Sequence, residues 1–232
     1  MRRRSRRVTS GDVGGTAPAG GTDWVDRHRG YDAPGGSLAR RLAVVRRRLA
    51  EALDAAAAAE PRLLSLCAGD GRDVVPVLAA RMPSRPAVAV LVERDPTLAR
   101  RAHEAAAAAG LAAGALTVRS ADAGAPRTFA DVLPVDVLLL CGIFGNVAEA
   151  DVQAVIGALP AMVVPGGTVV WTRGGGDPDR RPQVRAWFAE AGCEEAAFDG
   201  APERFGVGLH QLPTAQPGRP GPLPDRLFTF RR

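Results

Sequence analysis

The hydrophobic positions between residues 61 and 191 alternate between two patterns. Short apolar runs, rich in valine and leucine, have the length and composition of strands that are buried on both faces of a sheet. Between most of them lie stretches in which apolar residues recur every three or four positions, as on one face of a helix. We predict strands over residues 62–67, 87–93, 115–120, 135–141 and 168–172, and helices over residues 73–81, 97–109, 149–162 and 181–191. This alternation predicts an α/β fold: a Rossmann-like, doubly wound and mostly parallel sheet with helices on both faces.

The segments on either side of this region differ from it. Before it, the spacing of leucine and valine predicts a helix over residues 37–59, with Ser37 as its N-cap and Pro61 as its end. After it, strand-like pieces follow one another without helices between them, at residues 194–198, 205–212 and 227–230. They predict an antiparallel C-terminal edge, with His210 in an edge strand, and the proline-rich stretch 213–224 is expected to be an extended loop.

The chain is predicted to hold one domain with an N-terminal appendage. Residues 1–22 are rich in arginine and glycine and are expected to be disordered. Residues 23–60 are expected to form a lid segment and a helix. Residues 61–232 are expected to form the Rossmann-like domain.

Composition adds only a few constraints. The chain is 46% hydrophobic and 24% charged, which is typical of a globular protein. All 30 of its basic residues are arginines, and the run between residues 2 and 7 is expected to be a solvated tail, with an arm attracted to RNA or a membrane as the alternative. The three cysteines lie far apart, without metal-site or disulfide spacing, so a reducing cytoplasm is expected. The sequence shows neither a secretory signal nor an apolar stretch long enough to cross a bilayer.

The residues that can carry chemistry fall where the predicted strands end, which is where open α/β sheets bind their ligands. The first strand runs into the turn Cys67-Ala68-Gly69-Asp70-Gly71-Arg72-Asp73. Small residues let a ligand approach the backbone closely, and the free N–H groups of the following helix favour a negative group. This signal is not specific by itself, because many strand–helix turns contain glycine.

Two acidic residues end the next two strands. Glu93 lies 22 positions beyond Gly71, where an acid can accept hydrogen bonds from a ribose diol. A helix N-cap is the alternative role, although Asp95 suits that role better. Asp122, followed by Ala123, is placed to accept a hydrogen bond from an adenine amino group.

The fourth strand is followed by the loop Cys141-Gly142-Ile143-Phe144-Gly145-Asn146. Its two glycines give room for a ligand, and the ring of Phe144 is expected to form a wall of the pocket. Four signals at successive strand ends are much harder to obtain by chance than any one of them.

Residues 60–175 resemble a class I S-adenosylmethionine-dependent methyltransferase domain, and residues 24–230 resemble a group of such proteins common in actinobacteria. The resemblance implies that the turn at Cys67, Ala68, Gly69, Asp70 and Gly71, with Asp73, surrounds the methionine part of S-adenosyl-L-methionine. It implies that Glu93 holds the ribose and that Asp122 and Ala123 contact the adenine. The remaining residues of the expected cofactor site are Arg94, Cys141 and Gly142. The run Val164-Pro165-Gly166-Gly167 matches the turn before the fifth strand of the family.

Two positions depart from the family pattern. Ser65 stands where the family has an acid in its first strand, and Cys67 stands where it has its first glycine. The amino group of the cofactor therefore lacks its expected partner. Asp70 and Asp73 are the candidates to replace that partner, and reduced cofactor affinity is the alternative.

Other functions fit the residues less well. A nicotinamide-dependent oxidoreductase needs a third small residue where this chain has Val74. Amino-directed nucleic-acid methyltransferases carry an Asp/Asn-Pro-Pro-aromatic tetrad after the fourth strand, and cytosine-directed ones a Pro-Cys nucleophile, whereas Cys141 follows Leu140. An RNA methyltransferase and a non-catalytic S-adenosylmethionine-binding protein stay open as alternatives.

The expected reaction is in-line methyl transfer to a small-molecule acceptor, which needs positioning and exclusion of water rather than a metal. No acidic cluster resembles the magnesium site of catechol-type methyltransferases, so no metal is predicted, and nothing indicates an oligomeric state. We place the acceptor between residues 24–31, as an aromatic lid, and the loop 142–146. A strap packed on the domain is the alternative for residues 24–31. The expected acceptor contacts are Trp24, His28, Tyr31, Phe144 and Asn146, with His28, as a base, and Asn146 as catalytic candidates.

Overall fold

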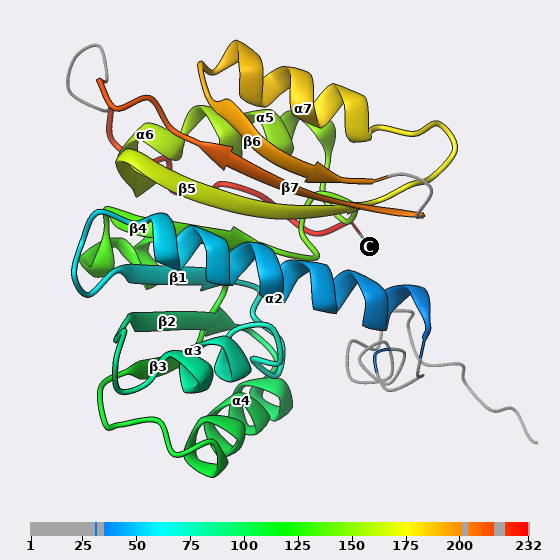
Figure 1. Ribbon diagram of the computed structural model, residues 1–232. Helices are drawn as coiled ribbons and strands as arrows, with labels where there is room; N and C mark the ends of the chain where they lie inside the picture. Colours follow the sequence, from blue (N-terminus) through cyan, green and yellow to red (C-terminus); the bar gives the residue numbers. More distant parts are fainter. Residues whose placement is uncertain (1–30, 32–34, 201–203, 216–220, 232) are drawn as a thin grey trace, which may run out of the picture.

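A seven-stranded sheet forms the centre of the protein in the computed structural model, which describes residues 31, 35–200, 204–215 and 221–231. The strand order is β3-β2-β1-β4-β5-β7-β6 (Figure 1). The first five strands in the chain are parallel, and β7 is antiparallel to both of its neighbours. The strands are β1 (Arg62–Leu66), β2 (Val88–Glu93), β3 (Leu116–Ser120), β4 (Val135–Leu140), β5 (Val163–Gly174), β6 (Glu194–Asp199) and β7 (Phe205–Gln211). The predicted fold class, a mostly parallel Rossmann-like sheet with an antiparallel edge, is confirmed.

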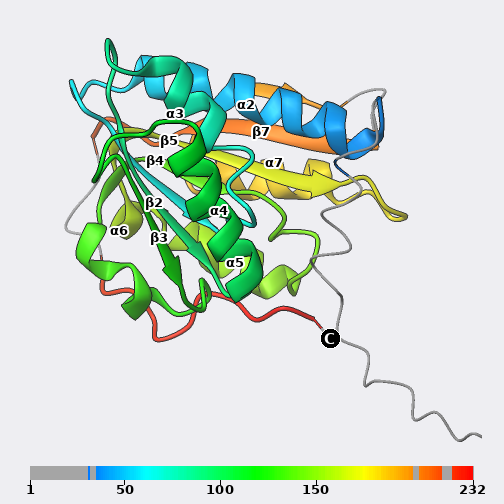
Figure 2. The same cartoon turned by 90° about the horizontal axis from the view of Figure 1, so that it is seen from below.

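Helices cover both faces of this sheet (Figure 1 and Figure 2). One face carries α2 (Ser37–Ala55), α3 (Val75–Arg81) and α4 (Pro96–Ala108), and the other carries α5 (Glu149–Gly157), α6 (Leu159–Met162) and α7 (Arg181–Glu190). Helix α2 packs across β4, β5 and β7. Its first turns project beyond the carboxyl ends of the parallel strands, as Figure 1 shows. The start of α2 therefore lies beside the edge where an open α/β sheet binds ligands.

The core on the α5–α7 face is built around large rings. Trp171 of β5 and Phe188 of α7 stack with their ring centroids 5.8 Å apart, and both are buried. Gly208 lies opposite Trp171 in the antiparallel β5–β7 pair, and a Cβ added there would lie 2.3 Å from the indole ring. Only glycine leaves room for the indole at this position. The indole N–H donates to Nδ1 of His210 at 3.1 Å.

Several element boundaries differ from the sequence prediction. Gly36, not Ser37, is the N-cap of α2, and the helix ends at Ala55 rather than at residue 59. The helix predicted over 149–162 is two helices, because Pro160 has no N–H to donate and its ring crowds the preceding turn. His210 lies in β7, which is an interior strand and not an edge strand.

The antiparallel region and β5 also differ from expectation. The piece 227–230 is not a strand and makes only an isolated bridge, between Val147 and Phe230. Strand β5 begins five residues earlier than predicted, and the Pro-Gly-Gly run lies inside it with a register shift against β4. A Cβ at Gly167 would lie 2.9 Å from the carbonyl oxygen of Asp136, so this close approach of two backbones requires glycine.

The expected tail 1–22 lies outside the described residues, as do Trp24 and His28. Within the described residues, no helix is both long and apolar enough to cross a membrane.

Candidate functional site

A cavity of about 600 Å³ lies over the carboxyl ends of the parallel strands. Its walls come from the turn after β1, the loops after β2, β3 and β4, the end of β5, the start of α2 and the C-terminal segment. The volume is within the usual range for small-molecule and cofactor sites, and the position is the one that open α/β sheets use.

The turn after β1 is held by the carboxylate of Glu93 at the end of β2. Oε2 of Glu93 accepts a hydrogen bond from the backbone N–H of Gly69 at 2.9 Å, and Oε1 accepts one from the N–H of Asp95 at 2.8 Å. The carboxylate is buried and still lines the cavity. Asp95 is the N-cap of α4, and its side chain accepts from the N–H groups of Thr97 and Leu98. The expected division of roles between the two acids is therefore present: Asp95 caps the helix and Glu93 faces the cavity.

The backbone of this turn explains its small residues. Gly69 and Gly71 have φ values of 59° and 71°, in the left-handed region that favours glycine. A Cβ at Gly71 would also lie 3.2 Å from Ala102 and from Val75. Cys67 has the same kind of backbone, with φ of 56°, at the position where the resembled family has its first glycine. A side chain there costs conformational energy of about 1–2 kcal/mol.

Of the two acids proposed to replace the missing partner of the cofactor's amino group, Asp73 is the one that lines the cavity. It is buried, and its Oδ1 has no hydrogen-bond partner among the described residues. The pKa of Asp73 is raised from 3.8 to about 6, mainly by burial and also by the nearby carboxylate of Asp70, while backbone N–H groups and Arg46 oppose the shift. Asp70, the other candidate, is paired with Arg72 at 2.5 Å and does not line this cavity. A buried acid with an unpaired oxygen has a cationic or N–H-bearing ligand as its natural partner.

Tyr31 and Arg41 lie beside Asp73. The hydroxyl of Tyr31 accepts a hydrogen bond from Arg41, and the guanidinium of Arg72 lies 4.9 Å from the centre of the Tyr31 ring. Burial raises the pKa of the Tyr31 hydroxyl, although the charge of Arg41 opposes the shift. Arg41 and Asp73 both act electrostatically on Tyr31 and on Cys141, so a positive and a negative group lie at the same end of the cavity.

Asp122, at the end of β3, is held from two sides. Its Oδ1 accepts the N–H of Gly124 at 2.9 Å, and its Oδ2 pairs with Arg226 at 3.0 Å. Burial alone would raise the pKa of Asp122, but the Gly124 N–H and Arg226 together lower it. The carboxylate is therefore ionised at neutral pH, and it lines the cavity beside Ala123.

The loop after β4 presents backbone and one amide side chain to the cavity. The N–H of Gly142 donates to Oγ1 of Thr172 at 2.9 Å, and Nδ2 of Asn146 donates to the carbonyl of Gly142 at 2.6 Å. Arg173, next to Thr172 in β5, donates to the carbonyl oxygen of Phe144. The loop is thus fixed from both the strand below it and its own last residue.

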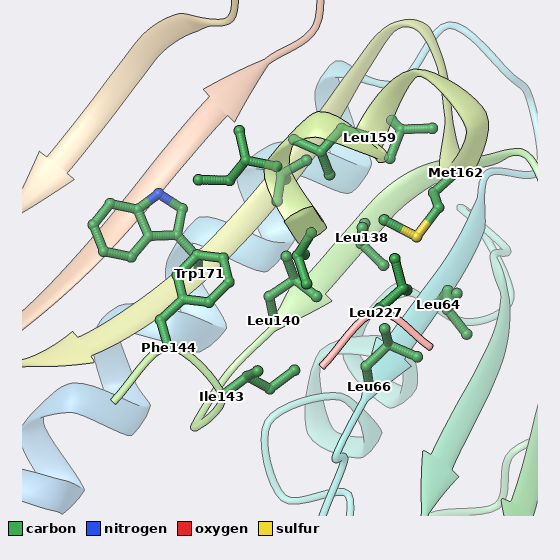
Figure 3. Close-up of a cluster of buried hydrophobic side chains, with 14 of the residues drawn as sticks. Leu64, Leu66, Leu138, Leu140, Ile143, Phe144, Leu159, Met162, Trp171 and Leu227 are labelled. Carbon is green, nitrogen blue, oxygen red and sulfur yellow. The ribbon is translucent and has the colours of Figure 1, made fainter. Parts of the chain in front are cut away.

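Phe144 does not have the position predicted for it. Its ring is fully buried and does not line the cavity; it packs in the core with its centroid 5.9 Å from that of Trp171. Figure 3 shows Phe144 beside Trp171, with Ile143 also turned into the core. The apolar residues of the loop face the α5–α7 core, so the cavity wall here is formed by Gly142, Gly145 and Asn146.

The C-terminal segment closes another side of the cavity. Its backbone N–H groups at Leu227 and Arg231 donate to the carbonyls of Gly124 and Asn146, so it links the loops after β3 and β4. Phe230 lines the cavity.

The cysteines in the cavity are not activated. Burial raises the pKa of both Cys67 and Cys141, so both thiols stay protonated at neutral pH. A protonated thiol is a poor nucleophile, and neither cysteine is therefore suited to covalent catalysis. Within the described part of the chain, no cluster of three or more His, Cys, Asp or Glu residues could hold a metal ion.

Most of the residues expected from the sequence lie together at the cavity. Those that line it are Tyr31, Cys67, Ala68, Asp73, Glu93, Arg94, Asp122, Ala123, Cys141, Gly142 and Asn146. Gly69, Asp70 and Gly71 shape the turn without lining the cavity, and Trp24 and His28 lie outside the described residues.

Several residues that the sequence analysis did not single out also line the cavity. Among them are Arg41, Arg173 and Phe230. Only Arg41 leaves a clear sequence signal, because a charged residue at spacing three from Leu38 falls on the apolar face of its helix.

Comparisons with solved structures identify the fold. The protein resembles an O-methyltransferase family protein from Burkholderia thailandensis, with a TM-score of 0.63 and 17% identity over 84% of this chain and 62% of the other. It resembles magnesium protoporphyrin IX methyltransferase from Synechocystis PCC 6803, solved with bound S-adenosylmethionine, with a TM-score of 0.59 and 13% identity over 82% and 92% of the two chains. A possible exported protein from Bordetella parapertussis matches with a TM-score of 0.59 and 19% identity, over 75% of this chain and 67% of the other.

No family model matches the sequence, and no curated protein matches it. The chain spans less than two thirds of the length of the Burkholderia protein. At these identities the comparisons establish a fold shared with S-adenosylmethionine-dependent methyltransferases.

Proposed function

We propose that this protein is an S-adenosylmethionine-dependent methyltransferase that acts on a small-molecule acceptor without a metal. The observation that carries the proposal is that Asp73 and Arg41, one acid and one cation, both line the end of the cavity beside Cys141. An α-amino acid carries an ammonium and a carboxylate on the same carbon, and this pair offers a partner for each. Asp73 has an unpaired buried oxygen that can accept a hydrogen bond from the ammonium. Arg41 carries N–H groups that can donate to the carboxylate.

The other end of the cavity suits a nucleoside. Glu93 uses one lone pair of each oxygen on a backbone N–H, which leaves further lone pairs for the two hydroxyls of a ribose. Asp122 is ionised and can accept a hydrogen bond from an adenine amino group, and Ala123 lines the cavity beside it. A nicotinamide dinucleotide has no ammonium group to pair with Asp73, so the amino acid end of the cavity favours S-adenosylmethionine.

When bound, S-adenosylmethionine supplies an electrophilic methyl group on a sulfonium. The protein's share of the reaction is to position both reactants and to exclude water, which is sufficient for an in-line displacement. The hydroxyl of Tyr31 accepts a hydrogen bond from the guanidinium of Arg41, and Thr172 and Asn146 fix the loop that forms the acceptor side. Cys67 and Cys141 are protonated thiols, so they contribute packing and not nucleophilicity.

Calorimetry on the full chain tests the proposal. S-adenosylhomocysteine should bind, and NAD should not. Binding of NAD without any response to S-adenosylhomocysteine would refute the methyltransferase assignment. Binding of S-adenosylhomocysteine without transfer of a radiolabelled methyl group to any of a broad acceptor panel would favour a non-catalytic binding protein instead.

A further inference from the structure

We propose that the methyl acceptor is a small organic acid, and that Arg173 binds its anionic group at the end of the cavity over β4 and β5. This inference rests on the proposed function, because the position of the acceptor follows from placing the cofactor between Asp122 and Asp73. It goes beyond that function by naming the chemical class of the acceptor and the residue that selects it.

Arg173 lines the cavity near the end of β5 and is partly buried. Burial lowers the pKa of Arg173, and the like charges of Arg231 and Arg180 also lower it, while Glu149 and Asp179 oppose the shift in part. A guanidinium stays protonated in proteins, so its partial removal from water is a cost that an anion nearby would offset.

The carboxylates of Glu149 and Asp179 offset only part of that cost, because each forms its ion pair with another arginine. Glu149 is paired with Arg180 at 3.1 Å, and Asp179 is paired with Arg181 at 2.8 Å. Arg173 itself makes no ion pair among the described residues, and its hydrogen bond to the carbonyl of Phe144 uses one of five N–H donors. The remaining donors are available to a ligand in the cavity.

The distribution of acids along the cavity points the same way. The acids that line the cavity are Asp73, Glu93, Asp95 and Asp122, and each of them ends or follows β1, β2 or β3. The lining from the loop after β4 and the end of β5 contains no acid; it consists of Cys141, Gly142, Gly145, Asn146, Thr172, Arg173, Gly174, Gly175, Gly176 and Pro178. This end is therefore positive, and it favours an acceptor of negative charge.

The glycines of this end leave room for the body of the acceptor. A Cβ added at Gly145, Gly174 or Gly176 would meet no atom within 4 Å, and none of the three has a left-handed φ. Neither packing nor backbone conformation therefore requires glycine at these positions. Gly175 differs, because a Cβ there would lie 3.1 Å from the guanidinium of Arg181. The three open glycines form a surface without side chains beside Arg173.

Matched pairs of ligands can test this inference on the full chain saturated with S-adenosylhomocysteine. The probes are carboxylates and their uncharged amides: benzoate and benzamide, phenylacetate and phenylacetamide, hexanoate and hexanamide. At least one acid should bind about tenfold or more tightly than its amide, because a charge-assisted hydrogen-bond pair contributes that much. Arg173→Gln should remove the preference, and Arg173→Lys, which keeps the charge, should retain part of it.

Glycine substitutions separate the shape of the site from the stability of the fold. Gly145→Ala and Gly174→Ala should weaken binding of the preferred acid and leave the binding of S-adenosylhomocysteine unchanged. Gly157→Ala is the matched control, since a Cβ there also meets nothing within 4 Å, but Gly157 lies in α5 and does not line the cavity.

Three results would overturn the inference. The first is that no acid binds better than its amide. The second is that the preference for the acid survives in Arg173→Gln. The third is that Arg173→Gln weakens the binding of S-adenosylhomocysteine by the same factor as the binding of the acid. The last result would place Arg173 in the cofactor site or in the support of the loop. If wild-type protein fails to bind S-adenosylhomocysteine at all, the proposed function itself fails, and the two failures are thereby distinguished.

Discussion

The carboxylate of Glu93 accepts a hydrogen bond from the backbone N–H of Gly69, across 2.9 Å, and so joins the ends of β2 and β1. Its second oxygen accepts from the N–H of Asp95, which begins α4. One buried side chain thus fixes two of the loops that form the cavity. The same carboxylate is proposed to hold the ribose, so structure and binding depend on it together.

Glu93→Ala should therefore have two effects. The free energy of unfolding should fall by about 1–3 kcal/mol, because two backbone N–H groups lose their acceptor. Affinity for S-adenosylhomocysteine should fall about ten- to a hundredfold, because a charge-assisted pair of hydrogen bonds is lost. Urea denaturation and calorimetry measure the two effects separately. Glu93→Gln keeps one acceptor, so its stability and its affinity should lie between those of the wild type and Glu93→Ala. A folded Glu93→Ala variant with an unchanged dissociation constant would contradict the ribose assignment.

Asp73 and Arg41 should matter only for the amino acid part of the cofactor. Asp73→Asn and Arg41→Gln are each expected to weaken binding of S-adenosylhomocysteine by about tenfold or more. Neither should change the affinity for 5′-methylthioadenosine, which shares the nucleoside and lacks the amino acid. Glu93→Ala is the control that should weaken both ligands, and calorimetry compares them. Equal losses for the two ligands in the Asp73 and Arg41 variants would show that these residues act on the whole site.

The raised pKa of Asp73 gives binding a pH dependence. The acid is protonated in the free protein below about pH 6, and only the carboxylate pairs with an ammonium. Affinity for S-adenosylhomocysteine should thus strengthen as the pH rises through about 6, and it should be flat over this range in Asp73→Asn. A wild-type affinity that does not change between pH 5 and 7 would argue against this role.

The same group affects stability with a definite sign. Because the pKa of Asp73 is higher in the folded protein than its ordinary value of 3.8, the folded state holds the proton more tightly, and stability is lost as the pH rises from about 4 to about 6. At pH 7, Asp73→Asn should increase the free energy of unfolding of the ligand-free protein by about 1–3 kcal/mol, and below pH 4 it should change little. Urea denaturation as a function of pH provides the measurement.

His210 should give a slope of the opposite sign. Burial lowers the pKa of His210 from 6.5 to about 4, although Glu195, 3.5 Å from its Nε2, opposes the shift. The folded state holds His210 neutral, so stability is fully present above pH 6.5 and is lost as the pH falls towards 4. The loss should be about 3 kcal/mol at most, since one pKa unit corresponds to about 1.4 kcal/mol.

Acid unfolding of two variants distinguishes these contributions. His210→Gln, which keeps an acceptor for the indole N–H of Trp171, should flatten the profile between pH 4 and 6.5. Asp73→Asn should instead steepen it, because the opposing contribution is removed. A His210→Gln profile parallel to that of the wild type would mean that the pKa of His210 is the same in the folded and the unfolded protein.

The strands and the cavity edge could be predicted from the sequence because both depend on local patterns. A buried parallel strand is a short apolar run, and the carboxyl ends of such strands gather at one edge whatever the details of packing. The residues at or just after the end of each strand could therefore be assigned to the cavity, as Glu93, Asp122 and Gly142 show. Their roles towards a ligand stay predictions.

Side-chain direction in loops could not be predicted in the same way. Phe144 was expected in the wall of the cavity, but an apolar ring close to a core of Trp171 and Phe188 gains more by joining it. Arg173 lies between apolar strand residues and a glycine run, and nothing local shows that its side chain reaches the loop after β4. The position of β7 between β5 and β6 depends on pairing over a long range, which no periodicity encodes.

The interior position of β7 has a consequence for the order of events on the ribosome. A nascent chain that has been made as far as residue 200 already contains Asp73, Glu93, Asp122 and Arg173, yet β5 is still an open edge and β6 has no strand beside it. Helix α2, the first element to be synthesised among those described, packs on β7, and its Arg48 pairs with Asp199 of β6 at 2.7 Å. The start of α2 supplies Arg41 to the cavity. This helix, which is made early, can pack on β7 only after residues 205–211 have left the ribosome. The domain is therefore expected to complete its fold after synthesis of β7, and not progressively from its N-terminus.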